Sequence, residues 1–339
     1  MLHVVECYAG GVKTAVDSYV ANSPDFTHFL LYSNRGSGSE PSLGFAASAQ
    51  LRHGHWKRIA DIRRAVLQWQ PDLIHAHSTY AGVYCRVRNT GRPVVYTPHC
   101  YAYERLDLGS PSRTLIRGVE RALASRTAVL VGCSEREADL SIAIGHKSVV
   151  FVPNVASIAP VPKENPRSHD LTVAFVGRLC PQKDPAFAAA VVARLRTALN
   201  KPFTAIWIGD GEADQLSLLS DAGIECLGWL PPQEVAAALA AATLYIHTAA
   251  WEGYPLSILE AIASGVAVIA RRIPAFTAMP DSCLGANPTE LADLAVGALL
   301  DQQRLDTLWT LWAQAVKEWT PQQQSTLLKK AYRQALPAL

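Results

Sequence analysis

The sequence predicts an α/β protein built from two doubly wound parallel sheets. Short apolar runs with β-strand character alternate with helical stretches along most of the 339 residues. The alternation stops once, at a polar, proline-rich segment over residues 156–170, and then starts again. A chain of this length is also long for one hydrophobic core and suits two domains. Alternating strands and helices are typical of parallel sheets with helices on both faces.

The first half of the chain contains the strands and helices of one such sheet. The strand candidates are apolar runs bounded by turn residues, at Leu2–Glu6, His28–Tyr32, Leu73–Ala76, Val94–Thr97, Ala128–Val131 and Val149–Val152. Helical patterns lie between them, near residues 12–21, 56–69, 112–125 and 134–144. We expect an N-terminal domain over residues 1–155.

The second half repeats the pattern after the linker. Its strand candidates are Leu171–Val176, Ala205–Gly209, Glu225–Leu227, Leu244–His247 and Val266–Ala270, with helices near 185–199, 233–241 and 256–264. The tail from about Thr289 is helical, and Pro321 starts a last amphipathic helix over residues 321–336. We expect a C-terminal domain over residues 171–320, with the last helix packing back on the N-terminal domain. Ligands bind beyond the carboxyl ends of such strands, so two facing sheets would form an interdomain cleft.

Composition excludes several classes of protein. The net charge is only +2, which argues against a nucleic-acid binder. Residues 1–153 carry 17 Lys+Arg against 12 Asp+Glu, so a basic N-terminal face could meet an anionic partner or membrane. The seven scattered cysteines contain no CxxC pair and indicate reduced cytosolic thiols. No signal-peptide pattern and no apolar run of ~20 residues occurs, so we expect a cytoplasmic protein with peripheral membrane contact at most.

Two glutamates in the segment Trp251–Ala261 are the strongest local signal. Glu252 lies in a turn with Gly253 and Pro255, and Glu260 lies one turn into an apolar helix. The turn exposes N–H groups at a helix N-terminus, which bind anions. Carboxylates flanking such an anion site can accept hydrogen bonds from sugar hydroxyls, which suggests a nucleotide-sugar pocket. The spacing alone fits a capped helix with Glu260 on a solvated face better.

Three other loops follow predicted strands. Arg178 and Lys183 share the loop Gly177–Asp184, and an Arg fork with a Lys point charge suits a diphosphate, or the two are surface cations. Gly209 and Gly211 allow close backbone approach to a ligand, although a plain turn explains them equally well. Gly10 and Gly11 open a helix after the first strand and could bind an anion or serve as a flexible connector.

Histidines mark two further strand ends. His99 closes Thr97-Pro98-His99 and can donate to a sugar hydroxyl or a phosphate oxygen, although a single histidine is more often structural. His75 and His77 resemble a metal pair, but no third ligand is evident nearby, so we treat them as core or cleft-edge residues. No Asp-x-Asp occurs in the sequence, so a bridging-metal nucleotide site has no obvious ligands.

Together, these loops resemble family 4 of the retaining glycosyltransferases, which have the GT-B fold of two facing Rossmann-like domains. The resemblance spans nearly the whole chain and rests on Gly10-Gly11, Thr97–His99, Pro153-Asn154, Gly177–Lys183, Gly209–Gly211 and the pair Glu252 and Glu260. One departure is Pro255, where many members have glycine. Proline removes one N–H donor, so Leu256 and Ser257 would supply more of the phosphate contacts.

The resemblance implies a retaining, metal-independent hexosyltransferase. It would move a sugar from a UDP- or GDP-sugar to a saccharide or lipid-linked acceptor, in cell-envelope or exopolysaccharide synthesis. No cofactor is implied. Arg178 and Lys183 would neutralise the leaving diphosphate with the helix N-terminus after Gly253, and His99 would contact the sugar near its anomeric carbon from the other domain. Glu260 would hold the ribose and Glu252 the donor sugar. The remaining implied contacts are Gly209, Gly211, Tyr254, Leu256 and Ser257 for the nucleotide, and Gly10 and Gly11 for an anion or the acceptor.

Two other functions remain open from the sequence. A nucleotide-sugar epimerase of GT-B-like fold would share the sheets and phosphate loops without an acceptor site. A non-catalytic nucleotide-sugar-binding subunit is the third possibility, and the presence of Glu252, Lys183 and His99 argues against it. A nicotinamide oxidoreductase is disfavoured because GxGxxG is missing.

The segment 52–64 suggests a membrane contact. It places Arg52, Lys57, Arg58, Arg63 and Arg64 around Trp56, Ile59 and Ile62 on a predicted helix. A basic face with an aromatic anchor can lie on an anionic bilayer. The alternative is a solvated helix that packs its apolar side on the sheet.

Overall fold

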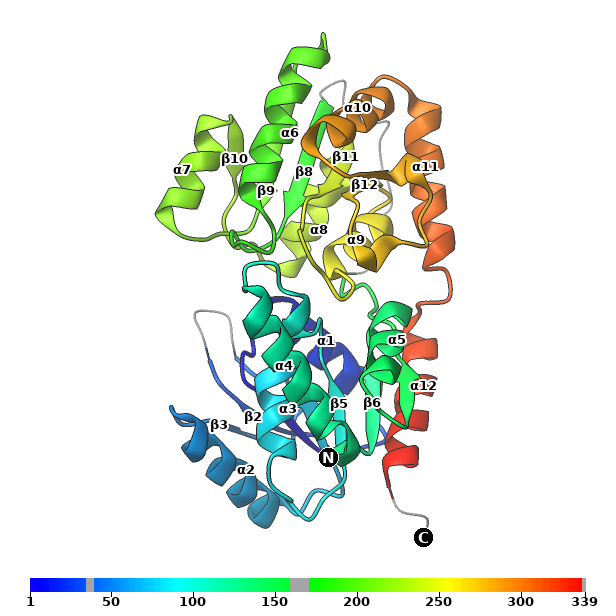
Figure 1. Ribbon diagram of the computed structural model, residues 1–339. Helices are drawn as coiled ribbons and strands as arrows, with labels where there is room; N and C mark the ends of the chain where they lie inside the picture. Colours follow the sequence, from blue (N-terminus) through cyan, green and yellow to red (C-terminus); the bar gives the residue numbers. More distant parts are fainter. Residues whose placement is uncertain (35–39, 159–170, 337–339) are drawn as a thin grey trace. The chain divides into compact units, whose positions relative to one another are not determined.

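The computed structural model describes residues 1–34, 40–158 and 171–336 (Figure 1). The chain forms two compact units, one of Met1–Val155 with Glu318–Leu339 and one of Ala156–Lys317. Residues 159–170, most of the predicted linker, lie outside the described residues. Each unit is an α/β body with its own parallel sheet, which confirms the predicted fold class.

In the described residues of the N-terminal unit, seven parallel strands form one sheet in the order β3-β2-β1-β4-β5-β6-β7. The strands are β1 (Leu2–Val5), β2 (Phe29–Tyr32), β3 (Ala47–Gln50), β4 (Ile74–His77), β5 (Val94–Thr97), β6 (Val129–Gly132) and β7 (Val149–Phe151). The helices of this unit are α1 (Gly10–Ala21), α2 (His55–Trp69), α3 (Ser78–Arg86), α4 (Ser110–Leu123), α5 (Glu135–Ala143) and α12 (Pro321–Ala335).

Within residues 171–317, six parallel strands form the second sheet, in the order β10-β9-β8-β11-β12-β13. They are β8 (Leu171–Val176), β9 (Phe203–Ile208), β10 (Ile224–Cys226), β11 (Leu244–His247), β12 (Ala267–Arg271) and β13 (Leu284–Gly285). The helices are α6 (Pro185–Ala198), α7 (Ala213–Asp221), α8 (Pro232–Ala241), α9 (Leu256–Ala263), α10 (Pro288–Leu299) and α11 (Gln302–Ala315).

Both sheets have the strand order of a Rossmann fold, in which the chain reverses direction across the sheet beside the first strand. The reversal lies between β1 and β4 in the N-terminal unit and between β8 and β11 in the C-terminal unit. Loops that follow these strands diverge to opposite faces and leave a crevice at the carboxyl edge, where such sheets bind ligands. The functional residues are therefore to be sought after β1, β4, β8 and β11.

The last helix, α12, belongs to the N-terminal unit. Its residues Leu328, Ala331 and Tyr332 are fully buried in one apolar cluster with the strands β5, β6 and β7. Its Gln324 side chain is also buried and donates to the backbone oxygen of Pro153 at 2.8 Å. The chain thus returns to its first unit after completing the second (Figure 1).

Polar caps explain where several helices begin. The Asp184 side chain accepts a hydrogen bond from the Phe187 amide, and proline follows at the first position of α6. Ser134 caps α5 and Thr320 caps α12 in the same way. Such side chains satisfy amides that have no partner within the helix, at about 1 kcal/mol each.

Two strands and two α-helices were not predicted from the sequence, namely β3, β13, α3 and α7. β3 is an edge strand whose residues Ser48–Gln50 are exposed, so it has no apolar run to reveal it. β13 contains only two residues. α3 begins directly at the end of β4, without a turn signal between them.

The membrane contact predicted for residues 52–64 stays a prediction, and its named residues divide into buried, paired and exposed ones. Ile59 and Ile62 are buried against the sheet, as the alternative expected, whereas Trp56, the aromatic anchor of the prediction, is 74% exposed. Arg52 precedes α2, and its guanidinium pairs with the Asp61 carboxylate at 2.7 Å. The cations of Arg58 and Arg64 are also paired, with Glu6 at 2.9 Å and with Asp61 at 3.3 Å. In the described part of the chain, no helix is long and apolar enough to cross a membrane.

Candidate active site

The two glycine loops of the C-terminal unit pack against each other at the carboxyl edge of the sheet. Gly177 follows β8 and Gly209 follows β9, and both have positive φ, +142° and +139°. A Cβ atom on Gly209 would lie 2.2 Å from the backbone oxygen of Gly177, and one on Gly211 would lie 2.4 Å from Leu179. Only glycine fits at these positions. The loops after β8 and β9, each a weak signal in the sequence, therefore pack together as one substructure.

The loop after β8 is joined to the loop after β11 by backbone and side-chain hydrogen bonds. The Ala250 amide donates to the Gln182 backbone oxygen at 2.8 Å, and the Gln182 side chain donates to the Trp251 oxygen at 3.0 Å. The Thr248 hydroxyl donates to the Lys183 oxygen at 2.7 Å. These contacts fix the position of Lys183 relative to the turn that carries Glu252. Sequence reasoning missed Gln182 and Thr248, because they act only through a contact between distant loops.

Lys183 and Glu252 form an ion pair across the switch point of this sheet. Lys183 Nζ lies 2.5 Å from Glu252 Oε1, and the side chains are only 18% and 10% exposed. The Lys183 stem runs over Gly177, where a Cβ atom would lie 2.7 Å from Lys183 Cε. A cation and a carboxylate are thus held side by side, ready to meet a ligand that carries both anionic and hydroxyl groups.

A buried histidine, His247, lies beside this pair and was not predicted. Its Nε2 atom is 3.9 Å from Glu252 Oε1 and has no hydrogen-bond partner among the described residues. Its Nδ1 atom is 2.9 Å from the Tyr245 hydroxyl, which also bonds the hydroxyl of Ser257 at 2.8 Å. Burial, and then the nearby Lys183 ammonium, hold the pKa of His247 well below its usual value. The ring is therefore neutral, and the Tyr245 hydroxyl links it to Ser257.

Glu260 lies on α9, and its carboxylate Oε1 accepts a hydrogen bond from the Ser157 hydroxyl at 2.5 Å. Burial raises the pKa of the Glu260 carboxyl, and the Ser157 bond and the nearby Lys183 charge partly oppose this. Glu260 is therefore not on a solvated face, as the spacing alone had favoured. Lys183 thus interacts with both glutamates of the motif: it forms an ion pair with Glu252, and its charge partly offsets the rise in the pKa of Glu260.

The amino end of α9 carries the other predicted donor residues. Pro255 precedes the helix, and Leu256 and Ser257 are its first two residues, with amides that cannot bond within the helix. Gly253 is buried in the turn, and the Tyr254 ring packs edge-on against Phe276 at 5.9 Å. Arg178 lies on the loop after β8 with an exposed side chain.

The remaining predicted residues belong to the N-terminal unit. Gly10 and Gly11 form the exposed start of α1 after β1, with φ of +51° at Gly10. His99 follows β5 and also has a positive φ, +51°, as does Cys100 at +78°. The buried Glu137 carboxylate accepts the Cys100 amide at 2.7 Å and the Cys133 amide at 2.8 Å. That carboxylate holds the turn on which His99 is presented.

The expectation that the His75 and His77 pair lacks a third neighbour is wrong. The register of β1 with β4 pairs His3 with His75, and ring nitrogens of His3, His75 and His77 lie within 4.8 Å of one another. All three side chains are fully buried. His3 was not predicted as a neighbour because 72 residues separate it from His75, and only the strand order brings them together.

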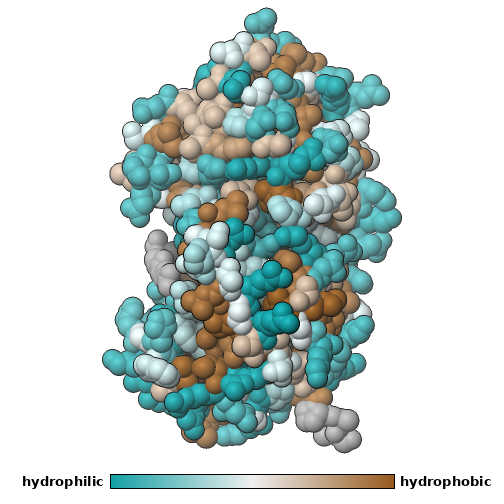
Figure 2. All heavy atoms as spheres, in the orientation of Figure 1, coloured by the Kyte–Doolittle hydropathy of each residue, from teal (hydrophilic) through white to brown (hydrophobic). Residues whose placement is uncertain are grey.

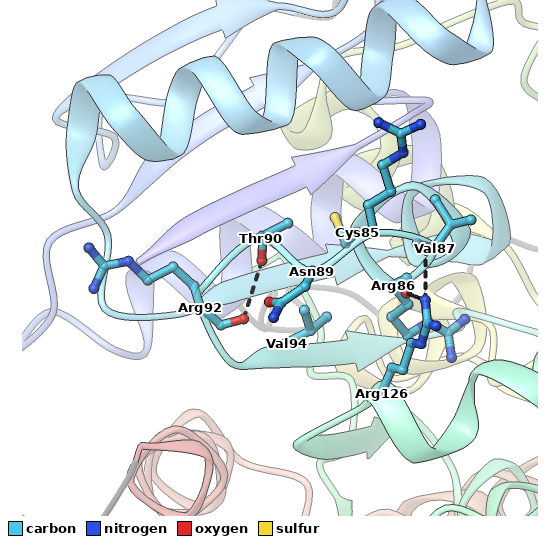
Figure 3. A pocket seen from close by; sticks show the side chains of 9 residues that line it. Cys85, Arg86, Val87, Asn89, Thr90, Arg92, Val94 and Arg126 are labelled. Atoms are coloured by element: carbon cyan, nitrogen blue, oxygen red, sulfur yellow. Dashed lines mark hydrogen bonds between the residues drawn. The ribbon is translucent and has the colours of Figure 1, made fainter.

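A pocket of about 480 Å³ lies elsewhere in the N-terminal unit, between the end of α3 and the start of β5 (Figure 3). It is lined by arginines, among them Arg88, Arg92 and Arg126, and the Arg126 guanidinium bonds the backbone oxygens of Arg86 and Val87. It opens where β5 begins, whereas ligands of doubly wound sheets bind beyond the carboxyl ends. It contains none of the predicted site residues.

Comparison with known proteins defines the class of this protein. Residues 170–301 match the family model of glycosyl transferases group 1, and residues 34–155 match that of the glycosyl transferase 4-like domain. The two matches fall on the two structural units and together span about three quarters of the chain. The chain belongs to the glycosyltransferases with the GT-B fold, and the resemblance seen in its motifs is confirmed.

Particular relatives are distant in sequence. An uncharacterised 41.2 kDa protein in the cps region of Klebsiella pneumoniae is 23% identical over 80% of this chain and 81% of its own. The UDP-Gal:alpha-D-GlcNAc-diphosphoundecaprenol alpha-1,3-galactosyltransferase of Escherichia coli is 25% identical over 64% of this chain and 62% of its own. Among solved structures, HepE of Anabaena in complex with UDP and glucose matches 98% of this chain and 99% of its own, with a TM-score of 0.79 and 16% identity. WaaG, a glycosyltransferase of lipopolysaccharide biosynthesis, matches 98% of both chains with a TM-score of 0.72 and 15% identity.

Proposed function

We propose that this glycosyltransferase moves a hexose from a UDP- or GDP-sugar to a saccharide or lipid-linked acceptor with retention of configuration and without a metal ion. The observation that carries the proposal is the Lys183–Glu252 pair, fixed over Gly177 between the loops that follow β8 and β11. The relative that uses UDP-Gal and a diphosphoundecaprenol acceptor, and the relative in a cps region, favour a role in cell-envelope or exopolysaccharide synthesis.

The leaving diphosphate would meet Lys183, Arg178 and the amino end of α9. In the free protein the Lys183 ammonium is neutralised by Glu252. A diphosphate entering beside Lys183 would exchange one anionic partner for another, and Glu252 would then accept hydrogen bonds from the sugar hydroxyls next to it. The amides of Leu256 and Ser257 would bind phosphate oxygens, since Pro255 has no N–H to offer. Charge is thereby stabilised where it develops as the glycosidic bond breaks.

Retention would follow if the acceptor hydroxyl attacks the anomeric carbon on the same face from which the leaving diphosphate departs. The bond between the anomeric carbon and the diphosphate oxygen breaks, and the acceptor hydroxyl forms its bond on the same face. The acceptor proton passes to the leaving phosphate oxygen, so no protein carboxylate is needed as the base. Glu252 would contribute by orienting the sugar.

Glu260 would bind the ribose hydroxyls. Its carboxylate already accepts the Ser157 hydroxyl, and a ribose hydroxyl would offer the same kind of donor. The glycines Gly209 and Gly211 would let the backbone approach the nucleotide closely, and Tyr254 would contribute its ring edge. On the N-terminal unit, Gly10 and Gly11 would contact an anion or the acceptor, and His99 the sugar near its anomeric carbon.

Independence of metal is supported by the positive groups that the chain itself places at the site. Lys183, Arg178 and the α9 amides supply the charge that a divalent ion supplies in other nucleotide-sugar enzymes. The sequence also has no Asp-x-Asp to hold such an ion. Transfer should therefore persist in excess EDTA, and an absolute requirement for added Mg²⁺ or Mn²⁺ would contradict this part of the proposal.

Peripheral contact with an anionic membrane is part of the proposal, and we place it on α4 in preference to α2. On α4, Leu115 is 69% exposed and Val119 is 38% exposed, one helical turn apart. Arg117 and Arg121 are exposed on the same helix. Figure 2 shows brown, apolar residues gathered on the face of the N-terminal unit where α4 lies in Figure 1. Exposed apolar residues between arginines suit the surface of an anionic bilayer, at about 1 kcal/mol per cation near the surface.

Two matched variants test this location by sedimentation with vesicles containing anionic phosphatidylglycerol at low salt. The change of Leu115, Arg117 and Arg121 to Ser on α4 should abolish binding. The change of Lys57 and Arg63 to Ser on α2 should weaken it only slightly. If the native protein does not sediment with the vesicles, the acceptor is soluble and membrane contact is to be abandoned.

Transfer itself is tested by incubation with a panel of UDP- and GDP-sugars and a lipid extract of acceptors. The expected result is release of nucleoside diphosphate that depends on the extract, together with a glycosylated product. An isomerised nucleotide sugar without free diphosphate would indicate the epimerase. Tight nucleotide-sugar binding with no turnover would indicate the non-catalytic subunit.

A further inference from the structure

A row of buried histidines connects the interior of the N-terminal unit to His99. His3 lies on β1, His77 at the end of β4, and His28 directly before β2. His3 Nδ1 is 3.0 Å from His77 Nε2, and His3 Nε2 is 2.9 Å from His28 Nδ1. His77 Nδ1 is 3.0 Å from His99 Nε2. The four rings are thus linked one to the next by hydrogen bonds, and His3, His28 and His77 are buried.

At the inner end of this row, the direction of the hydrogen bond is fixed. His28 Nε2 lies 2.9 Å from the backbone oxygen of Ser23, and a carbonyl oxygen can only accept. His28 Nε2 must therefore carry a proton. Burial lowers the pKa values of His28, His3 and His77, which keeps the rings neutral. A neutral ring has one protonated and one unprotonated nitrogen, so His28 Nδ1 is an acceptor.

The direction of this first hydrogen bond then determines the direction of each hydrogen bond that follows in the row. His28 Nδ1 can only accept, so His3 donates through Nε2 and has an unprotonated Nδ1. For the same reason His77 donates to His3 through Nε2, and its Nδ1 accepts from His99 Nε2. Every ring in the row is forced into the Nε2-protonated form by the single carbonyl of Ser23.

We propose that this row of hydrogen bonds fixes neutral His99 with its proton on Nε2, so that His99 Nδ1 is presented as a hydrogen-bond acceptor. His28, His3 and His77 are positioning residues that act through His99. The consequence for the reaction rests on the proposed function. An unprotonated nitrogen attracts a sugar hydroxyl and repels a phosphate oxygen. His99 Nδ1 would therefore accept a hydrogen bond from a hydroxyl of the donor sugar. This replaces the sequence-based expectation that His99 donates to a sugar hydroxyl or a phosphate oxygen.

A metal ion held by His3, His75 and His77 is the competing explanation for these rings. Zinc needs unprotonated nitrogens that converge on one point. Here both ring nitrogens of His3 and of His77 already pair with other rings as donor and acceptor. The nitrogens of His75 lie beside the Thr97 hydroxyl at 2.8 Å and the Tyr332 hydroxyl at 3.1 Å. The hydrogen bonds account for every ring nitrogen of these three residues without an ion.

The test reads the protonation of the ring nitrogens directly, by ¹⁵N-edited NMR of the full-length protein labelled at histidine. The spectra are recorded at pH 7.5, with His99 assigned from the variant His99→Gln. We expect His99 with Nε2 protonated and Nδ1 bare, and we expect that Nδ1 stays bare when UDP is added. A protonated Nδ1, before or after UDP, would overturn the proposal. This measurement needs no turnover, so it stands or falls separately from glycosyl transfer.

Variants of His28, at the inner end of the row, distinguish the effect of hydrogen-bond direction from the effect of ring packing. In His28→Phe the ring shape is retained but His3 loses its acceptor, so His99 should show a mixture of both neutral forms. In His28→Gln the amide can donate to Ser23 and accept from His3, and the wild-type spectrum of His99 should return. An unchanged His99 in a folded His28→Phe protein would overturn the relay. So would a stoichiometric metal ion in the purified protein that shifts the His3, His75 and His77 signals when EDTA removes it.

Discussion

The substitution Gly177→Ala tests how the site holds its central cation. A Cβ atom at this position would lie 2.7, 2.9 and 3.0 Å from Lys183 Cε, Cγ and Cδ, whereas ordinary contacts begin at 3.4 Å. The Lys183 stem must therefore withdraw by more than half an ångström from the place where it meets Glu252. A misplacement of ~1 Å in a catalytic group can cost about 100-fold in rate. We expect turnover to fall by about 10- to 100-fold.

The same substitution also strains the backbone, and this effect must be separated from the first. Gly177 has a φ of +142°, which residues with a side chain rarely adopt, at a cost of roughly 1–3 kcal/mol. Gly228→Ala is the matched control, because Gly228 has a φ of +70° in the same unit and a Cβ atom there meets nothing within 4 Å. Both variants should lose stability in thermal unfolding, and only Gly177→Ala should lose turnover.

The assay is acceptor-dependent release of nucleoside diphosphate, measured for both variants and in the Lys183→Ala background. If Gly177 acts by making room for Lys183, its substitution should cost nothing further once Lys183 is alanine. Turnover within twofold of wild type in Gly177→Ala would refute this role of Gly177. An equal loss of rate in both backgrounds would also refute it, since the effect would then not pass through Lys183.

Three further predictions follow from the site. Lys183→Met should lower turnover by about 10²- to 10³-fold with EDTA present, because it removes a preorganised charge at the leaving group; recovery of the lost rate by added Mg²⁺ would contradict this. By calorimetry, Glu260→Gln should weaken binding of free UDP while Glu252→Gln leaves it within twofold and damages transfer, and equal losses of affinity would contradict the division between ribose and sugar. Burial lowers the pKa values of His99 and His146 to about 4, below the 6.5 of the unfolded chain. Between these values the unfolded chain binds more protons, so stability should fall as pH decreases from about 6.5 toward 4; a thermal midpoint that stays flat between pH 7 and pH 5 in wild type would count against neutral buried rings.

Much of the fold could be predicted from local sequence because most of its strands are buried on both faces. Strands such as β5, β6 and β11 are buried along their whole length and are mostly apolar, so they appear as short apolar runs. β3 escaped prediction because it lies at the sheet edge, where exposed polar residues suffice.

The loops of the site could be predicted, but their contacts could not. Each motif follows a strand, which is a local property. Lys183 and Glu252 are 69 residues apart and meet only because the sheet places β8 beside β11. The approach of the Lys183 stem to Gly177 depends on a loop geometry that spacing does not specify. His3 illustrates the same limit, because its partners come from β4 and from the turn before β2.

Retaining, metal-independent transfer is tested most directly by ¹H NMR of the first product formed from an α-linked UDP- or GDP-sugar with EDTA present. We expect an α-linked product, with one nucleoside diphosphate released for each sugar transferred and the signal lost in Lys183→Met. A β-linked first product would contradict retention. Wild-type activity in Lys183→Met would contradict the proposed role of the Lys183–Glu252 pair.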